Sequence, residues 1–165
     1  MPLVTSPPSN VTAEQLLLAE ALVAAQLGVA GLDEGTLAES GVLGGSGLIV
    51  LTHPCVSIQA LALNSAPAAG ILRGPWTVDV LSVTRGQPVP YTISYTWGWT
   101  AATLPPGIRA AILLTAQAGT AAAGRVGLKA ESMGPVSYQY TDTATQGSLP
   151  ADALALLRPW LPLRF

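Results

Sequence analysis

A long uncharged segment constrains the fold of this chain more than any other feature of the sequence. Residues 110–124 contain no charged side chain, and Thr103 and Gly124 are residues typical of the two ends of a helix, so the pattern predicts a helix over about 104–123. The uncharged segment is shorter than the stretch that a bilayer-spanning helix needs. We therefore expect the helix to be buried by protein.

The apolar residues of this central helix do not keep to one stripe. Ile108 and Ile112 share one side, whereas Leu113 and Leu114 extend over the rest. A helix that is apolar all round is buried on more than one side. A chain of 165 residues cannot easily enclose such a helix alone. We expect one face to pack on the chain's own strands and another on a neighbouring copy, with these four residues in core or ring contacts.

The composition agrees with extensive burial between proteins. Charged residues make up 10% of the chain, against roughly 25% in ordinary soluble domains, and the mean hydropathy is +0.47. The sequence shows neither a membrane span nor a signal-peptide pattern, so we expect no membrane partner. The net charge is −2, and every charge before Arg73 is acidic, which is unlike a protein that grips nucleic acid.

The N-terminal part predicts an arm followed by a helix. Residues 1–10 are rich in Pro and Ser, so we expect an extended, poorly ordered arm. Asn10 or Thr12 caps the helix, and Gln15 stands where a capping box requires it. Gly28 is a natural end for this helix. Its apolar surface is broad, which again indicates a packing element.

Residues 28–47 are interrupted by glycines and are expected to form a flexible connection. The glycine-rich run 41–47 lacks the Lys-Ser/Thr of a P-loop and the spacing of a dinucleotide fingerprint. Residues 48–99 alternate in hydropathy and predict a β-rich insert.

The clearest alternation in the insert predicts a strand with one aromatic face. That face carries Tyr91, Ile93, Tyr95, Trp97 and Trp99. Exposed, it would be a stacking platform for bases or sugars. Since no cations are interleaved, a core or subunit-interface face is the stronger interpretation.

The C-terminal part predicts a β-hairpin over 126–132 and 136–141, a helix over 149–157 and an apolar tail over 158–165. Prolines at 159 and 162 prevent the tail from continuing as helix. The tail either folds back on its own core or adds to a partner as an extended segment. The fold class is therefore α+β, with one domain over 11–157.

Residues capable of chemistry are scarce. His53 and Cys55 are two residues apart, but a zinc site needs three or four ligands and the chain has no other His or Cys. A Cys–His nucleophile would also need an orienting partner, and none is evident. The acidic residues of the first forty positions are expected on solvated faces. We expect no catalytic residues, no metal and no cofactor.

Four segments of the chain form a recognisable series. They are residues 21–28, Tyr95-Thr-Trp-Gly98 followed by the Leu-Pro-initiated segment 104–114, residues 129–138, and residues 149–160. In this order they resemble the end of the first helix, the aromatic strand and central helix, the hairpin, and the closing helix and tail of one family. That family is the head–tail connector (adaptor, or head-completion) family of tailed double-stranded DNA phages. The sequence departs from the family late in the central helix, where it has Gly-Thr-Ala-Ala-Ala-Gly.

The resemblance implies a structural virion protein rather than an enzyme. It implies a ring of twelve copies under the portal protein, which extends the DNA channel without sequence-specific binding and receives the next neck or tail ring. It implies assembly in the host cytoplasm and a final place in the virion neck. The tail would dock on the portal, and the aromatic strand would join the insert to the helices. The docking residues would be Trp160, Leu161, Leu163, Arg164 and Phe165.

Other functions stay open at this stage. A stopper or tail-terminator ring differs from an adaptor mainly in its partner. A carbohydrate- or surface-binding module would use Tyr91, Tyr95, Trp97 and Trp99 as an exposed platform. A small hydrolase would need Cys55 with a lowered thiol pKa.

Overall fold

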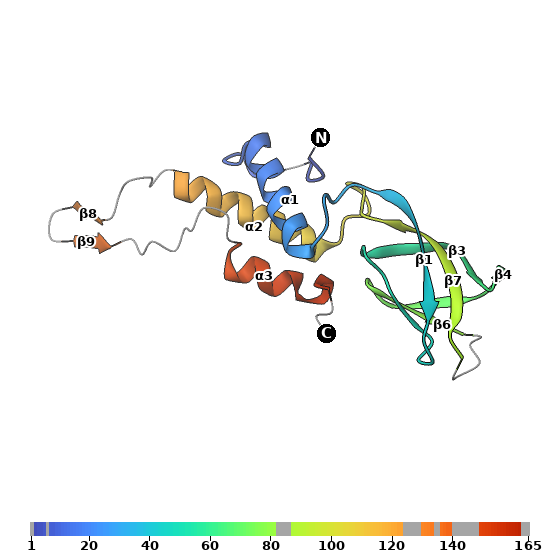
Figure 1. Cartoon of the computed structure of the whole chain (residues 1–165). Coiled ribbons are helices and arrows are strands. Elements are labelled where there is room, and N and C mark those ends of the chain that lie inside the picture. The colour runs from blue at the N-terminus through green and yellow to red at the C-terminus, as the bar shows by residue number, and fades with distance from the viewer. Residues whose placement is uncertain are drawn as a thin grey trace.

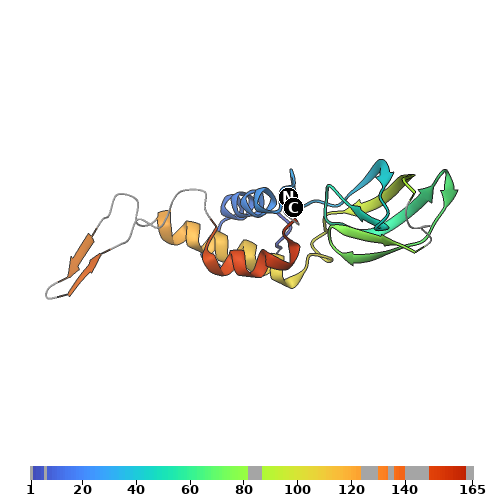
Figure 2. The same cartoon turned by 60° about the horizontal axis from the view of Figure 1, so that its bottom comes forward.

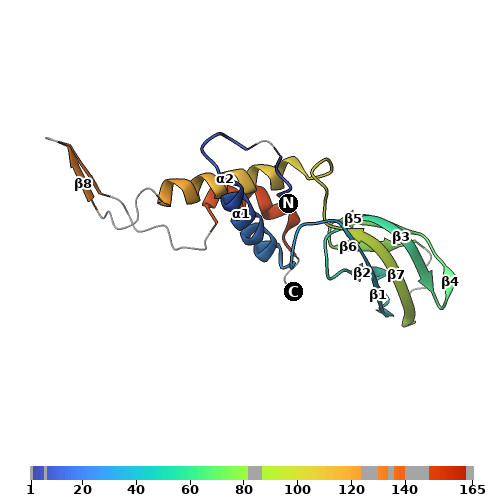
Figure 3. The same cartoon turned by 90° about the horizontal axis from the view of Figure 1, so that it is seen from above.

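The computed structural model describes residues 2–5, 7–81, 87–123, 130–133, 136–139 and 149–162. The fold is α+β, as expected: a β-rich region lies between the first two of three helices. Figure 1 shows the helices grouped together, with the β-rich region on one side of them and a small hairpin beyond the far end of α2. The same arrangement is visible from above in Figure 3.

The elements follow one another in an order that alternates helical and β segments. They are α1 (Ala13–Leu27), β1 (Gly35–Leu43), β2 (Leu48–Val50), β3 (Cys55–Leu63), β4 (Ala66–Pro67), β5 (Gly70–Gly74), β6 (Thr77–Val80), β7 (Val89–Trp97), α2 (Pro106–Ala123), β8 (Ala130–Met133), β9 (Val136–Gln139), α3 (Ala151–Leu157) and the short 3-10 helix η1 (Arg158–Trp160).

Helix α1 begins and ends as its sequence predicts. Thr12 Oγ1 accepts a hydrogen bond from the Gln15 amide at 3.3 Å, and Gln15 Oε1 accepts one from the Thr12 amide at 2.8 Å. These two bonds form the expected capping box. Gly28 ends the helix at a φ of 74°, a left-handed conformation that favours glycine.

The segment before α1 packs more closely than a loose arm would. Leu3 and Val4 are buried in the helical core, and Glu20 Oε1 accepts hydrogen bonds from their amides at 2.6 and 3.3 Å. The prediction of a solvated Glu20 is wrong, because this carboxylate is buried where it satisfies two backbone donors of the N-terminal segment.

The β-rich region is built from two sheets that enclose a core of their own. Strands β1-β7-β3-β4 form one antiparallel sheet and β2-β6-β5 the other. The largest fully buried side chains between them include Tyr95, Ile93, Leu43 and Ile49. Figure 2 shows the sheets lying to one side of the three helices.

The prediction of a flexible connection over 28–47 is wrong for residues 35–43, which form strand β1. Two of its glycines occupy strand positions opposite aromatic residues: Gly35 pairs with Trp97 and Gly41 with Tyr91. A Cβ at either glycine would lie 2.9 Å from the facing side chain. These glycines therefore make room for the aromatic rings of the paired strand, so glycine here is compatible with a strand. The β-rich region accordingly begins at residue 35 rather than 48.

The aromatic strand is shorter than predicted. Strand β7 ends at Trp97, and Gly98 turns the chain at a φ of 73°. Trp99 therefore does not lie on the same face of the strand as Tyr95. It enters the helical core, where its amide donates to the Leu32 carbonyl at 2.8 Å. The residues before the turn belong to the sandwich that the two sheets form, and Trp99 after it belongs to the helical core.

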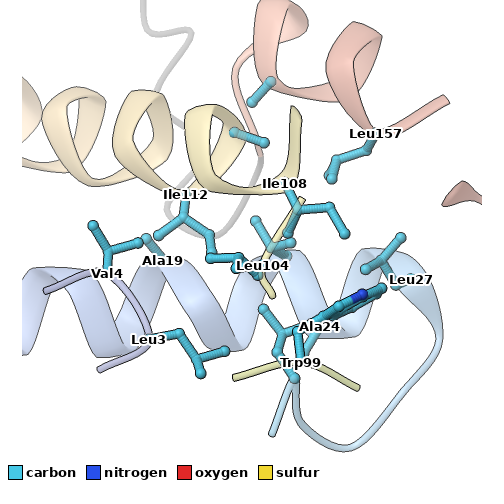
Figure 4. Close-up of a cluster of buried hydrophobic side chains, with 14 of the residues drawn as sticks. Leu3, Val4, Ala19, Ala24, Leu27, Trp99, Leu104, Ile108, Ile112 and Leu157 are labelled. Carbon is cyan, nitrogen blue, oxygen red and sulfur yellow. The ribbon is translucent and has the colours of Figure 1, made fainter. Parts of the chain in front are cut away.

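Helix α2 begins two residues later than predicted, and Thr103 is not its N-cap. The Thr103 hydroxyl instead accepts from the Thr100 amide at 2.9 Å, in the turn that precedes the helix. The expectation that α2 packs on strands is also wrong: it packs between α1 and α3. Figure 4 shows Ile108 and Ile112 pointing from α2 toward α1, with Leu157 of α3 nearby.

The predicted C-terminal hairpin is present as β8 and β9, paired from Ala130 with Gln139 to Met133 with Val136. Residues 126–129 and 140–141 of that prediction lie outside the described residues. Within the described ranges, none of the helices combines the length and the hydropathy needed to cross a membrane.

Replacing Gly98 with alanine should destabilise the fold by about 3 kcal/mol, because a left-handed non-glycine residue is strained and the new Cβ would collide with the Asp33 carbonyl. Urea unfolding followed by circular dichroism measures the change. Gly44→Ala is the matched control, since a Cβ there meets no atom within 4 Å. Equal stability of the two variants would contradict this account of the turn.

Candidate interaction surfaces

The four residues predicted for ring or core contacts divide into two pairs. Ile108 and Ile112 are fully buried between the chain's own helices. Leu113 and Leu114 are half-buried and pack at the edge of that core. The first pair therefore stabilises the subunit itself, and only the second pair has surface left for a neighbour.

The described part of the C-terminal tail folds back onto the helical core. The Trp160 carbonyl accepts a hydrogen bond from Trp76 Nε1 at 2.7 Å, and the Trp160 ring meets Trp99 edge to face with 5.6 Å between ring centres. Leu161 packs against the same core. Of the predicted docking residues, Leu163, Arg164 and Phe165 lie outside the described residues.

The aromatic strand residues face inward rather than forming a platform. Tyr95 and Trp99 are 0% and 3% exposed, one in the sandwich core and the other in the helical core. Tyr91 and Trp97 are half-buried against the sandwich. A ring buried to this extent offers no face on which a sugar can stack, so the core interpretation of this strand is the one the structure supports.

A hydrogen-bond network surrounds Glu39 at the edge of the sandwich. Its Oε1 accepts from the Tyr95 hydroxyl, the Thr52 hydroxyl and the Thr52 amide, the last at 3.2 Å. Burial, with the Glu39 hydrogen bond and charge as smaller causes, raises the pKa of the Tyr95 phenol above its ordinary range. Glu39 was expected on a solvated face; it is half-buried, and its hydrogen bonds tie β1 to β7 and to the β2–β3 connection.

His53 and Cys55 do not form a catalytic pair. The His53 ring lies 4.7 Å from the Trp97 ring, and its Nδ1 is 3.0 Å from the Thr52 hydroxyl. Cys55 is buried in the sandwich core, and burial raises the pKa of its thiol to about 11. A nucleophilic cysteine needs access to substrate and a lowered pKa, so the burial of this thiol disfavours a hydrolase that uses Cys55. Among the described residues, no three potential ligands gather as a metal site requires.

Helix α1 carries the most exposed apolar stripe of the helical layer. Leu17 and Leu18 are 47% and 63% exposed, and Ala21 and Ala25 continue the exposed side by one and two turns. A hollow of about 170 Å³ opens beside Leu17 and Ala21. Sequence analysis identified a broad apolar surface here but no site. The sequence signal for this exposed stripe was the run Leu16-Leu17-Leu18, because a helix packed on one side cannot bury three consecutive residues.

Helix α2 has an uncharged outer face. Gln117 and Ala121 are exposed, while Ala110, Leu113 and Leu114 are half-buried. These residues follow the spacing of one helical stripe on the side opposite Ile108. No charged residue follows Arg109 in the helix. The chain therefore has two separate helix faces that are apolar or uncharged.

No protein-family model and no curated protein matches this sequence. Distant likenesses exist among solved structures, at 17 or 18% sequence identity. The neck of an empty gene transfer agent particle, computed with C6 symmetry, matches with a TM-score of 0.48 over 92% of this chain and 77% of the other. The native virion gives 0.46 with the same coverage, and the native neck with C12 symmetry gives 0.47 over 92% and 82%.

The Cys55 thiol should react about a hundredfold more slowly with iodoacetamide in the folded protein than in urea, because a pKa raised from 9.0 to about 11 leaves about a hundredth of the thiolate. Mass spectrometry of the alkylated protein at pH 8 measures both rates. Fast alkylation of the folded chain would restore the nucleophile hypothesis.

Removing the Tyr95 hydroxyl should change how stability depends on pH. The folded pKa of Tyr95 lies above the ordinary 10.0, so its contribution is complete below pH 10 and falls above it, as the unfolded chain releases the proton first. The loss is at most about 1.4 kcal/mol per pH unit for one proton. Urea titrations between pH 8 and 11 should show a shallower decline for Tyr95→Phe than for wild type. If the stability of both proteins declines equally with pH, the pKa of the Tyr95 phenol is not raised by folding.

Proposed function

We propose that this chain is a structural protein of a phage-like virion, the adaptor that forms a ring under the portal and receives the tail. The observation that carries the proposal is the pair of exposed helix faces on α1 and α2, which carry no charge beyond the first turn of each helix. A soluble subunit rarely leaves contiguous apolar surface uncovered unless another protein covers it. A ring supplies such cover on two different sides of every copy.

The order of elements gives further support. The resemblance to head–tail connectors predicts a first helix, an aromatic strand, a Leu-Pro-initiated helix, a hairpin and a closing helix. The chain has α1, β7, α2, the β8–β9 hairpin and α3 in that order. The glycine of the predicted motif, Gly98, is the residue that turns the chain from the sandwich into the helical core.

In this proposal twelve copies surround a channel through which DNA passes. Weak charge suits such a channel, because DNA that must move through it cannot be held by its phosphates. The half-buried Leu113 and Leu114 contribute to contacts between copies. Residues 163–165 contact the portal, since Trp160 and Leu161 pack on the subunit's own core. The ring assembles in the host cytoplasm and remains in the virion neck. A stopper or tail-terminator ring is the second candidate, since the same apolar faces would serve it.

Light scattering with and without the purified portal of the same virus tests the proposal. We expect the chain to join the portal as a particle with many copies. Truncation after Pro162 should weaken this association and leave the fold intact, because Trp160 and its bond to Trp76 are retained. A chain that stays monomeric and does not bind the portal would overturn the adaptor assignment. A ring that forms equally well without residues 163–165 would overturn only their docking role.

A further inference from the structure

The β8–β9 hairpin stands apart from both cores of the chain. Figure 1 shows it beyond the far end of α2, on the side away from the β-rich region, and Figures 2 and 3 show the same separation from two other directions. In the part of the chain that the structure describes, its sheet contains only these two strands. A two-stranded hairpin is at best marginally stable alone in water, and a further strand or a packed helix is needed to stabilise it. We therefore expect a second protein chain to complete this sheet.

The register of the hairpin shows which backbone groups are available to such a partner. Met133 and Val136 are paired with two residues between them, so this pair closes the hairpin and exchanges both of its backbone hydrogen bonds. Bonded and non-bonded pairs alternate along an antiparallel ladder, so the next pair, Ser132 and Ser137, is non-bonded. The N–H and C=O groups of these two serines therefore point away from each other, toward the two outer edges of the hairpin. The pair two residues further along the ladder has the same geometry.

Both edges of the hairpin lack the features that keep an open strand from pairing. Residues 130–133 and 136–139 contain no proline and no lysine, and their register has no bulge. Glu131 is their only charged residue. Proline, bulges and charges, lysine above all, are the means by which proteins prevent an open sheet edge from binding another strand. The backbone of each edge is thus free to accept a strand from a partner.

We propose that β9 of one copy pairs with β8 of the next copy, so that the hairpins of the ring form one continuous sheet. The inference rests on the proposed function and names the backbone groups that join its subunits. Every copy in a ring has the same surroundings, so this contact uses both edges of every hairpin. The sheet then closes on itself with two strands from each copy, and closure is the arrangement that leaves no edge unpaired.

The direction of the strands agrees with this pairing. Strands β8 and β9 are antiparallel within a copy, and a rotation between copies places each β9 beside the next β8, again antiparallel. A two-fold contact, in which β8 meets β8 or β9 meets β9, uses one edge and leaves the other open. Pairing with β1, the strand at one edge of the larger sheet, has the same defect. A ring contact between unlike strands is therefore the one that completes the hairpin.

Disulfide trapping tests which strand lies beside which. Paired residues in an antiparallel ladder have Cα atoms about 4.5–5.5 Å apart, which is within the span of a disulfide. Three one-to-one mixtures of single variants cover the aligned register and a slip of two residues in either direction: Ser132→Cys with Ser137→Cys, Ser132→Cys with Gln139→Cys, and Ala130→Cys with Ser137→Cys. After oxidation of the ring assembled with its portal, at least one mixture should give a covalent dimer on a non-reducing gel.

Each single variant, oxidised without its partner variant, should stay monomeric on the same gel, and wild type controls for the native Cys55 thiol. A dimer formed by one variant alone would overturn the proposal, because it would show two identical strands in contact. An intact ring in which none of the three mixtures gives a dimer would overturn it as well, and would assign the hairpin edges to the portal or to β1.

The variant Ser132→Pro gives an independent readout by light scattering with the portal. Proline removes one outward N–H and spares the hydrogen bonds within the hairpin, because Ser132 belongs to a non-bonded pair. We expect the fraction of chain in rings to fall about tenfold, since the facing carbonyl loses its donor in every contact. Ser132→Ala keeps the N–H and should assemble as wild type does.

The urea unfolding midpoint of the subunit should be the same for both variants, because the hairpin lies away from the two cores (Figure 1). If wild type forms no ring with the portal, the proposed function itself fails and this contact fails with it. If wild type and Ser132→Pro form rings equally well, only the contact between hairpins fails.

Discussion

The junction at Gly98 is the constraint on which the rest of this structure depends. The chain has two hydrophobic cores, one between the sheets and one among the helices, and consecutive aromatic residues are divided between them. Tyr95 and Trp97 belong to the sandwich, whereas Trp99 belongs to the helices. A residue with positive φ between Trp97 and Trp99 makes this division possible, because a continued strand would keep all three rings on one side.

A second connection fastens the same junction from the C-terminal end. Trp76 directly precedes β6 of the sandwich in the sequence. Its side chain is nevertheless buried in the helical core, where its indole N–H donates to the Trp160 carbonyl. Trp160 meets Trp99 edge to face. Three tryptophans from distant parts of the sequence thus fix the sandwich against the helices. Aromatic residues suit this role, since each buries a large apolar area and the indole still has a polar atom to satisfy.

Elements with strong local signals could be predicted from the sequence. The predictions were wrong where contacts between distant residues determine the structure. The capping box and Gly28 define α1 through interactions within a few residues, so both were predictable. Strand β1 was not, because its glycines look like loop residues until Trp97 and Tyr91 are known to lie opposite them. Glu20 was expected in solvent for a similar reason: its partners are amides sixteen and seventeen residues away. The exposed leucines of α1 were visible as a broad apolar surface, but their exposure depended on which side α2 covered.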